Sequence, residues 1–203
     1  YELVSPLRTL VHWVVVAAGG LLMHAASVGR PAAAGPVRGA LLLGEAGYGK
    51  STTTLACLQR GWVTCGDDAV VLGREHGQWV VWPVYAAVKT KLHSEHVDMW
   101  SNADIVTWEI AGTKRAHRLT ATDSGLLADQ MVVDALVVLD PAADPDAAWT
   151  QVSGSRARTL AAPSTAIPLP FDRDVVLRRI GELCAQTASY VLPRRTQLPT
   201  TVD

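Results

Sequence analysis

Apolar residues form one nearly continuous run between positions 11 and 29, VHWVVVAAGGLLMHAASVG. Its length approaches the ~18–20 residues with which a helix crosses a bilayer. Two histidines and the pair Gly19-Gly20 interrupt the run, and paired glycines are typical of a turn. The pattern therefore predicts two buried strands, Trp13–Val16 and Leu21–Ser27, joined by the glycine turn, and it argues against a membrane span.

The next apolar positions predict a strand followed by a helix. Residues 41–43 form a short apolar run that ends at Gly44, as a buried strand does. The segment Lys50–Arg60 places Leu55 and Leu58 on one face of a helix. Apolar runs that follow predict a hairpin after this helix, and therefore a mixed sheet. The runs are Trp62–Cys65, Ala69–Leu72 and Gln78–Trp82, with a turn at His76-Gly77.

The second half of the chain has weaker patterns. Residues 84–99 favour a connection followed by a helix. Further expected elements are strands at Ile105–Ile110, Arg118–Ala121 and Ala135–Leu139, a loop at Asp140–Pro145 and a helix within Pro170–Gln186. Together they predict one α/β domain over residues 1–192 and a loose tail over residues 193–203. The first residue is Tyr1, so a further N-terminal region is compatible with the sequence.

Composition narrows the class of protein. The chain has 203 residues, is 49% hydrophobic, and carries 18 basic and 19 acidic side chains. This is the composition of a folded domain, and its charge balance gives no reason to expect a nucleic-acid or membrane partner. Cys57, Cys65 and Cys184 have no paired spacing, which favours core thiols in a reducing cytoplasm over disulfides or a metal site.

One motif carries candidate chemistry. Gly44-x-x-x-x-Gly49-Lys50-Ser51 fits the phosphate-binding pattern G-x-x-x-x-G-K-[ST], and it stands between the predicted strand and helix. In such a loop backbone N–H groups surround phosphate oxygens, the lysine reaches the β- and γ-phosphates, and the serine hydroxyl binds Mg²⁺. The expected nucleotide-binding residues are Gly44, Glu45, Ala46, Gly47, Tyr48, Gly49, Lys50, Ser51 and Thr52.

Two adjacent carboxylates, Asp67 and Asp68, follow on the next predicted strand. Neighbouring side chains of a regular strand point to opposite faces, so a shared site requires a twist or bulge, which Gly66 permits. One carboxylate would then hold Mg²⁺ and the other accept a proton. Two alternatives stay open: a solvated turn, or a metal ligand at Asp140, which follows an apolar run in the manner of many nucleotide hydrolases.

The stretch LLLGEAGYGKSTTTLACLQRGWVTCGDDAVVL resembles the HPr kinase/phosphorylase family and its wider group of HPr-kinase-like proteins. ATP-dependent phosphoenolpyruvate carboxykinases have a similar arrangement. The resemblance implies an α/β kinase domain with a mixed sheet, using ATP and Mg²⁺. It implies that Asp67 is the general base and Asp68 a metal ligand with Ser51. His24, in the similar segment LMHAAS, would lie near the transferred phosphate and act with Lys50 in catalysis.

Other segments agree with or depart from that family. Lys89–Leu92 and Lys114-Arg115 resemble its later strand and basic pair. Thr52 stands where HPr kinases have Glu, and residues 108–115, WEIAGTKR, stand in place of an Arg-Gly-Leu-Gly-Ile signature. These departures favour the divergent members that phosphorylate a serine of a lasso peptide precursor. The expected partner is thus a peptide or protein that presents a Ser hydroxyl.

Three other functions are compatible with the sequence. A nucleotide hydrolase would use Asp140, and a small-molecule kinase would share the phosphate loop. A nucleotide-sensing scaffold would bind ATP only to stabilise an oligomer. Relatives of this kind form rings, and the sequence leaves homo-oligomerisation open.

Overall fold

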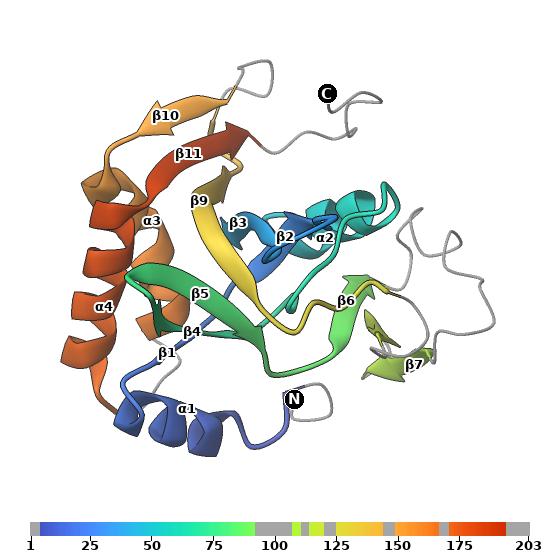
Figure 1. Ribbon diagram of the computed structural model, residues 1–203, viewed down its shortest axis with the longest axis horizontal. Coiled ribbons are helices and arrows are strands. Elements are labelled where there is room, and N and C mark those ends of the chain that lie inside the picture. The colour runs from blue at the N-terminus through green and yellow to red at the C-terminus, as the bar shows by residue number, and fades with distance from the viewer. Residues whose placement is uncertain are drawn as a thin grey trace.

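The structure is a computed structural model that describes residues 5–91, 107–110, 114–119, 125–143, 149–166 and 171–193. In these segments the chain forms a large mixed sheet, a small sheet and helices (Figure 1). The helices are α1 (Arg8–Ala17), α2 (Lys50–Leu58), α3 (Gly154–Ala166) and α4 (Arg173–Gln186). The small sheet contains β6 (Ala87–Lys91), β7 (Thr107–Ile110) and β8 (Lys114–Arg118).

The large sheet is organised around its longest strand, β9 (Met131–Asp140). Its other strands are β1 (Leu21–Met23), β2 (Ala26–Arg30), β3 (Arg38–Leu43), β4 (Val70–Glu75), β5 (Gln78–Pro83), β10 (Thr150–Val152) and β11 (Ala188–Pro193). Strands β3 and β11 pair with β9 in parallel, whereas β5 pairs with it antiparallel. The β4–β5 hairpin also pairs with β1. The predicted mixed α/β sheet and its hairpin are therefore confirmed.

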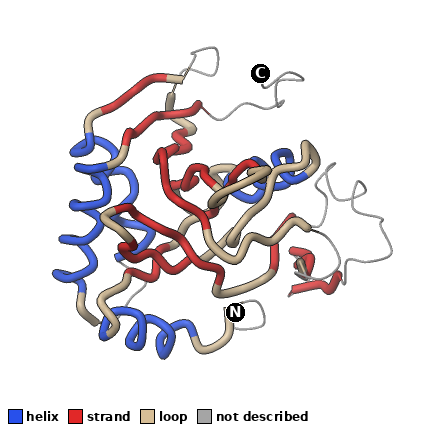
Figure 2. Tube along the Cα trace, in the orientation of Figure 1, coloured by secondary structure: helices blue, strands red, loops and turns tan. Residues whose placement is uncertain are grey.

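Both faces of β3 are buried, and successive side chains alternate between two apolar cores. Leu41 and Leu43 belong to the core that includes Ile180 of α4, while Leu42 packs with Val137 on the opposite face. Helices α3 and α4 cover the first face, and α2 lies across from them (Figure 2). The apolar run 41–43 thus forms a strand because both faces of the sheet are covered.

A third apolar cluster connects α2 to the small sheet. Leu55 and Leu58 of α2 are buried with Val88 of β6 and Leu119, which directly follows β8. The sequence placed Leu55 and Leu58 on the inward face, and the structure confirms this. The contact sets the small sheet beside α2.

The expected strand Trp13–Val16 is wrong, because this segment belongs to α1. Its inward positions follow a helical spacing: the buried or half-buried residues are Arg8, Val11, His12, Val15 and Val16. Trp13 and Val14 are exposed, so apolar residues on the outer face masked the helical period. The second expected strand, Leu21–Ser27, forms two strands, β1 and β2, with His24 and Ala25 between them.

Other predicted elements were displaced or missed. Within residues 84–99 the structure has strand β6 rather than the start of a helix, because Val88 is buried against α2 and β6 pairs with β8. The strand expected at Arg118–Ala121 is β8, which ends at Arg118. The sequence did not predict α3 or β11. Residues 92–106 and the tail beyond residue 193 lie outside the described residues.

In the described part of the chain no helix is both long and apolar enough to cross a membrane.

Candidate functional site

The site is built around the loop between β3 and α2. Strand β3 ends at Leu43 and helix α2 begins at Lys50. Gly49 precedes the helix in a left-handed conformation (φ 104°), which a residue with a side chain adopts only with strain. The first-turn N–H groups of α2 have no partners within the helix, so this end attracts anions. The strand, loop and helix thus have the order that the sequence predicted.

Lys50 is the buried cation of the site, with 6% of its surface exposed. Its Nζ donates to the carbonyl oxygens of Gly44 (2.6 Å) and Glu45 (3.1 Å) and lies 3.1 Å from His24 Nε2. Burial lowers the pKa of Lys50, while the charges of Asp67 and Asp68 raise it. Lys50 is thus held against the loop with both carboxylates near enough to act on its charge.

His24 lies between Lys50 and Asp68. Its Nδ1 is 2.8 Å from the main-chain oxygen of Asp68, and because that oxygen only accepts, Nδ1 carries the hydrogen. Nε2 is then free to accept from Lys50. Burial and the Lys50 charge lower the pKa of His24 to about 4, so the ring is neutral at physiological pH. The backbone N–H of His24 donates to Thr165 Oγ1 of α3 (3.2 Å).

The two aspartates lie in a bend before β4, which begins only at Val70. The expectation that they sit on a regular strand is therefore corrected. Gly66 has φ 154°, and its carbonyl oxygen accepts from Ser27 N (2.9 Å) and Thr64 Oγ1 (3.1 Å). These contacts fix the bend, and both carboxylates lie near enough to Lys50 for their charges to raise its pKa.

Asp67 is almost fully enclosed, with 2% exposure. Its Oδ2 accepts from the backbone N–H of Lys89 (3.0 Å), whereas Oδ1 is buried with no hydrogen-bond partner. Burial raises the pKa of Asp67 to about 6, although the Lys89 N–H and a hydrogen bond with Ser51 act to lower it. Asp67 is therefore a carboxylate that lacks a full set of compensating positive partners.

Asp68 is more open and better compensated. Its Oδ2 accepts from Lys89 Nζ (2.9 Å) and from Ser5 Oγ (3.1 Å). Burial alone would raise the pKa of Asp68, but the charge of Lys89, its hydrogen bond and the charge of Arg8 act against burial, and the pKa is lowered to about 2. Asp68 is thus ionised across the physiological range and already accepts a hydrogen bond from an aliphatic hydroxyl.

The alternative acidic residue, Asp140, ends β9 near the same loop. Its Oδ1 accepts from Ala142 N (2.9 Å), and Oδ2 lies 3.9 Å from the Arg156 guanidinium. Its charge acts on Tyr48 in the loop, whereas the charges that act on Lys50 come from Asp67, Asp68, Lys114 and Glu45. Asp140 is thus engaged in its own turn and lies beside Arg156.

The remaining residues expected to bind nucleotide line the loop and the start of α2. Glu45, Ala46 and Gly47 are exposed, whereas Gly44 is buried. The half-buried positions are Tyr48, Gly49, Ser51 and Thr52. The middle of the loop is therefore exposed to solvent, whereas Lys50 at its end is buried.

Basic residues from the small sheet extend the site. Lys89 of β6 contacts both aspartates, through its backbone to Asp67 and its side chain to Asp68. Lys114 of β8 is exposed and near enough to lower the pKa of Lys50. The sequence singled out both lysines, and their placement adds two cations to the site.

The residues present fit a magnesium ion. Mg²⁺ takes oxygen ligands and is commonly bound by one or two carboxylates together with substrate phosphates. Asp67 Oδ1 is a buried oxygen without a partner, and Ser51 lies near enough to the same carboxylate to lower its pKa. Within the described residues no group of three or more His, Cys, Asp or Glu side chains is placed to hold a metal. Phosphate oxygens would therefore complete the coordination.

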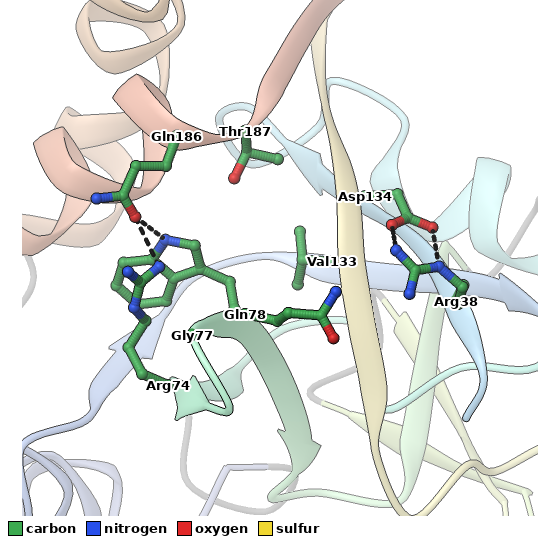
Figure 3. A pocket seen from close by; sticks show the side chains of 9 residues that line it. Arg38, Arg74, Gly77, Gln78, Val133, Asp134, Gln186 and Thr187 are labelled. Atoms are coloured by element: carbon green, nitrogen blue, oxygen red, sulfur yellow. Dashed lines mark hydrogen bonds and ion pairs between the residues drawn. The ribbon is translucent and has the colours of Figure 1, made fainter. Parts of the chain in front are cut away.

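A polar pocket of about 410 Å³ lies at the other end of β3 and β9 (Figure 3). Arg38 starts β3 and is paired there with Asp134, while Gln186 accepts from Arg74 (2.6 Å) and Trp79 (3.0 Å). These polar groups are hydrogen-bonded to one another, so fewer of them are available to bind a ligand than at the loop before α2.

Three contacts of the site were absent from the sequence analysis. Ser5 donates to Asp68, the charge of Arg8 acts on His24 and Asp68, and Thr165 holds the backbone of His24. No local pattern marks them, because they reach the site only through the packing of α1 and α3.

Comparison with solved structures finds distant similarities. The chain is similar to the Hpr(Ser) kinase/phosphatase from Coxiella burnetii with a TM-score of 0.45 and 16% identity, over 85% of each chain. No protein-family model matches the sequence. No curated protein matches it either. What the site does is therefore argued from its own geometry.

Proposed function

We propose that this chain is an ATP- and Mg²⁺-dependent phosphotransferase whose acceptor is a serine hydroxyl. The observation that carries the proposal is the meeting of Lys50, Asp67 and Asp68 at the loop before α2. Phosphoryl transfer needs a cation for the phosphates, a metal ligand and a group that orients the acceptor. Lys50, Asp67 and Asp68 would supply these three functions, and they lie close enough for their charges to act on one another.

The contacts support a division of labour between the two aspartates. Asp67 has the unpartnered oxygen and Ser51 acts on its pKa from close by, so these two residues would hold Mg²⁺, which neutralises charge on the phosphates when bound. Asp68 already accepts from a hydroxyl, so it would orient the acceptor and take its proton. This exchanges the roles that the resemblance implied for the pair.

His24 and the basic residues would position the reacting groups. The neutral His24 accepts from Lys50 and donates to the main chain of Asp68, so it links the phosphate-binding cation to the acceptor side. Lys89 and Lys114 would add positive charge where charge gathers on the transferred group. Catalysis would then consist mainly of positioning and electrostatic stabilisation.

The proposed acceptor is a serine of a peptide, and the sequence resemblance makes a lasso-type precursor the first peptide to test. Incubation with ATP, Mg²⁺ and candidate peptides, followed by mass spectrometry, separates phosphopeptide from a phosphorylated metabolite or free phosphate. Asp68→Asn should retain nucleotide binding and lose about 10²-fold or more in transfer rate.

The matched control is Asp134→Asn, which removes a carboxylate at the opposite end of the sheet and should leave transfer unchanged. Lys50→Ala should abolish nucleotide binding. If Asp140→Asn instead abolishes turnover while Asp68→Asn does not, the chain is a nucleotide hydrolase and the kinase proposal fails.

A further inference from the structure

We propose that Ser5 is an internal phosphoacceptor, so that the chain phosphorylates its own N-terminal segment within the site. The inference rests on the proposed function. Ser5 is 6% exposed although it lies ahead of α1, and its Oγ donates to Asp68 Oδ2 (3.1 Å). This hydroxyl therefore occupies the position from which Asp68 would orient any acceptor.

The segment that carries Ser5 is held in place at the two residues that follow it, Pro6 and Leu7. The Tyr85 hydroxyl, between β5 and β6, donates to the main-chain oxygen of Pro6 (2.8 Å). Leu7 then adopts a left-handed conformation (φ 58°), which is uncommon for a residue other than glycine and starts α1. Backbone strain of this kind persists where surrounding contacts hold it, so this segment has a defined conformation in which Ser5 reaches Asp68.

A short chain of contacts connects Ser5 to the phosphate-binding lysine. Asp68 joins Ser5 to His24, and His24 joins Asp68 to Lys50 (3.1 Å). The Ser5 oxygen is thus two residues removed from the group expected to bind the terminal phosphates.

Cations are already present for the product. Phosphorylation adds a dianion and strong acceptor oxygens, which are stable beside Arg and Lys side chains. Lys89 Nζ contacts the same Asp68 oxygen as Ser5 (2.9 Å). The charge of Arg8 acts on Asp68, and Arg8 Nε is buried with no hydrogen-bond partner. Phosphoserine at position 5 would therefore gain partners that the free hydroxyl does not use.

The reaction balances with ATP as the donor. A bond forms between Ser5 Oγ and the γ-phosphorus as the bond from that phosphorus to the β-bridging oxygen breaks. The hydroxyl proton passes to Asp68 Oδ2 and from there to solvent, and ADP leaves. Because Ser5 is enclosed by its own site, transfer should occur within one molecule, and its rate should not depend on protein concentration.

The test is phosphosite mapping by mass spectrometry after incubation of the full chain with ATP and Mg²⁺ and no added peptide. A single phosphoryl group on Ser5, formed at a rate independent of protein concentration and absent in Ser5→Ala and Lys50→Ala, is the expected result. Thr9→Ala removes an exposed hydroxyl one turn away in α1 and should leave labelling unchanged. Calorimetric nucleotide binding confirms that Ser5→Ala is folded.

The outcomes separate the two proposals. If Lys50-dependent nucleotide binding or transfer to a peptide is present while Ser5 stays unmodified, the inference about Ser5 is overturned and the kinase proposal stands. Labelling whose rate rises with protein concentration overturns transfer within one molecule. If the chain binds no nucleotide, the proposed function fails and the inference fails with it.

Discussion

Burial shifts the pKa values of two side chains of the site, Asp67 and His24, in opposite directions. Asp67 is enclosed without a full set of positive partners, so its pKa rises to about 6. His24 is enclosed beside Lys50, so its pKa falls to about 4. Each change disfavours the charged form, yet one group takes up a proton more readily on folding and the other less readily. Their effects on stability therefore oppose each other between pH 4 and 6.5.

Replacement of Asp67 should change the pH dependence of stability in a defined direction. A carboxyl whose pKa is raised in the folded state stabilises the protein at low pH, and this contribution is lost as the pH rises through about 6. The Asp67→Asn variant lacks this carboxyl group. Its unfolding free energy should therefore rise relative to that of the wild type by about 2 kcal/mol as the pH increases from 4.5 to 7. Urea unfolding of both proteins without nucleotide or Mg²⁺ measures this difference in free energy. A difference that stays constant with pH contradicts the prediction.

His24→Gln should give the opposite slope. A histidine with a lowered pKa in the folded state stabilises the protein above pH 6.5, and this contribution is lost as the pH falls toward about 4. The unfolding free energy of the variant should therefore rise relative to that of the wild type by about 2 kcal/mol as the pH falls from 7 to 4.5. The same urea titrations serve, and His76→Gln, which removes an exposed histidine in a hairpin turn, is the control that should show no such gain.

Helices α3 and α4 pack closely because small residues line their contact. Ala157 and Ala161 of α3 are buried, and a Cβ on Gly154 would lie 2.2 Å from the main-chain oxygen of Cys184 in α4. Helix α3 has a single large apolar residue, Leu160, where an inward helix face usually shows several, and Pro163 lies within it. This is why the sequence did not predict the helix, although its residue Thr165 supports His24.

Two glycine substitutions distinguish close packing from helix propensity. Gly154→Ala should destabilise the protein by about 1–3 kcal/mol, because the new methyl group meets backbone that cannot move aside. Gly181→Ala places a methyl group inside α4 at 3.5 Å from the flexible end of Arg158, so it should stabilise by up to about 1 kcal/mol. Thermal unfolding of both variants measures the effects, and equal losses would show that the α3–α4 approach is not the cause.

The molecule brings its site together from every major part of the fold. The loop comes from β3 and α2, His24 from between β1 and β2, and the aspartates from the bend before β4. Lys89 and Lys114 come from the small sheet, and Ser5 and Arg8 from the segment at the start of α1. Nucleotide binding should therefore stabilise the whole domain.

ATP with Mg²⁺ at 100 times its dissociation constant should raise the unfolding free energy by about 2.7 kcal/mol, because ligand binds only the folded state. Differential scanning fluorimetry should show the corresponding rise in Tm. The rise should vanish in Lys50→Ala and persist in Arg38→Ala, which alters the distant pocket of Figure 3. A Tm that does not respond to nucleotide in the wild-type chain contradicts the proposed function.

Local sequence was sufficient where one segment contains its own physical cause. The apolar run 41–43, the helix after Lys50 and the hairpin around His76-Gly77 were predicted because their periods and turn residues are local. The phosphate-loop motif was also visible, since its glycine positions and spacing define it, whereas the bend at Asp67 and Asp68 was only allowed by Gly66 within an expected strand. Their chemical role stays a prediction.

Tertiary structure decided what local pattern could not. Apolar residues occur on both faces of α1, so only its packing distinguishes the helix from the strand that the sequence predicted. Residues 87–91 form a strand because Val88 packs on α2 and β8 pairs alongside. The pKa values of His24 and Asp67, and the approach of Ser5 to Asp68, depend on burial and on partners distant in sequence. The sequence supplied the reactive groups, whereas folding set their distances and their protonation.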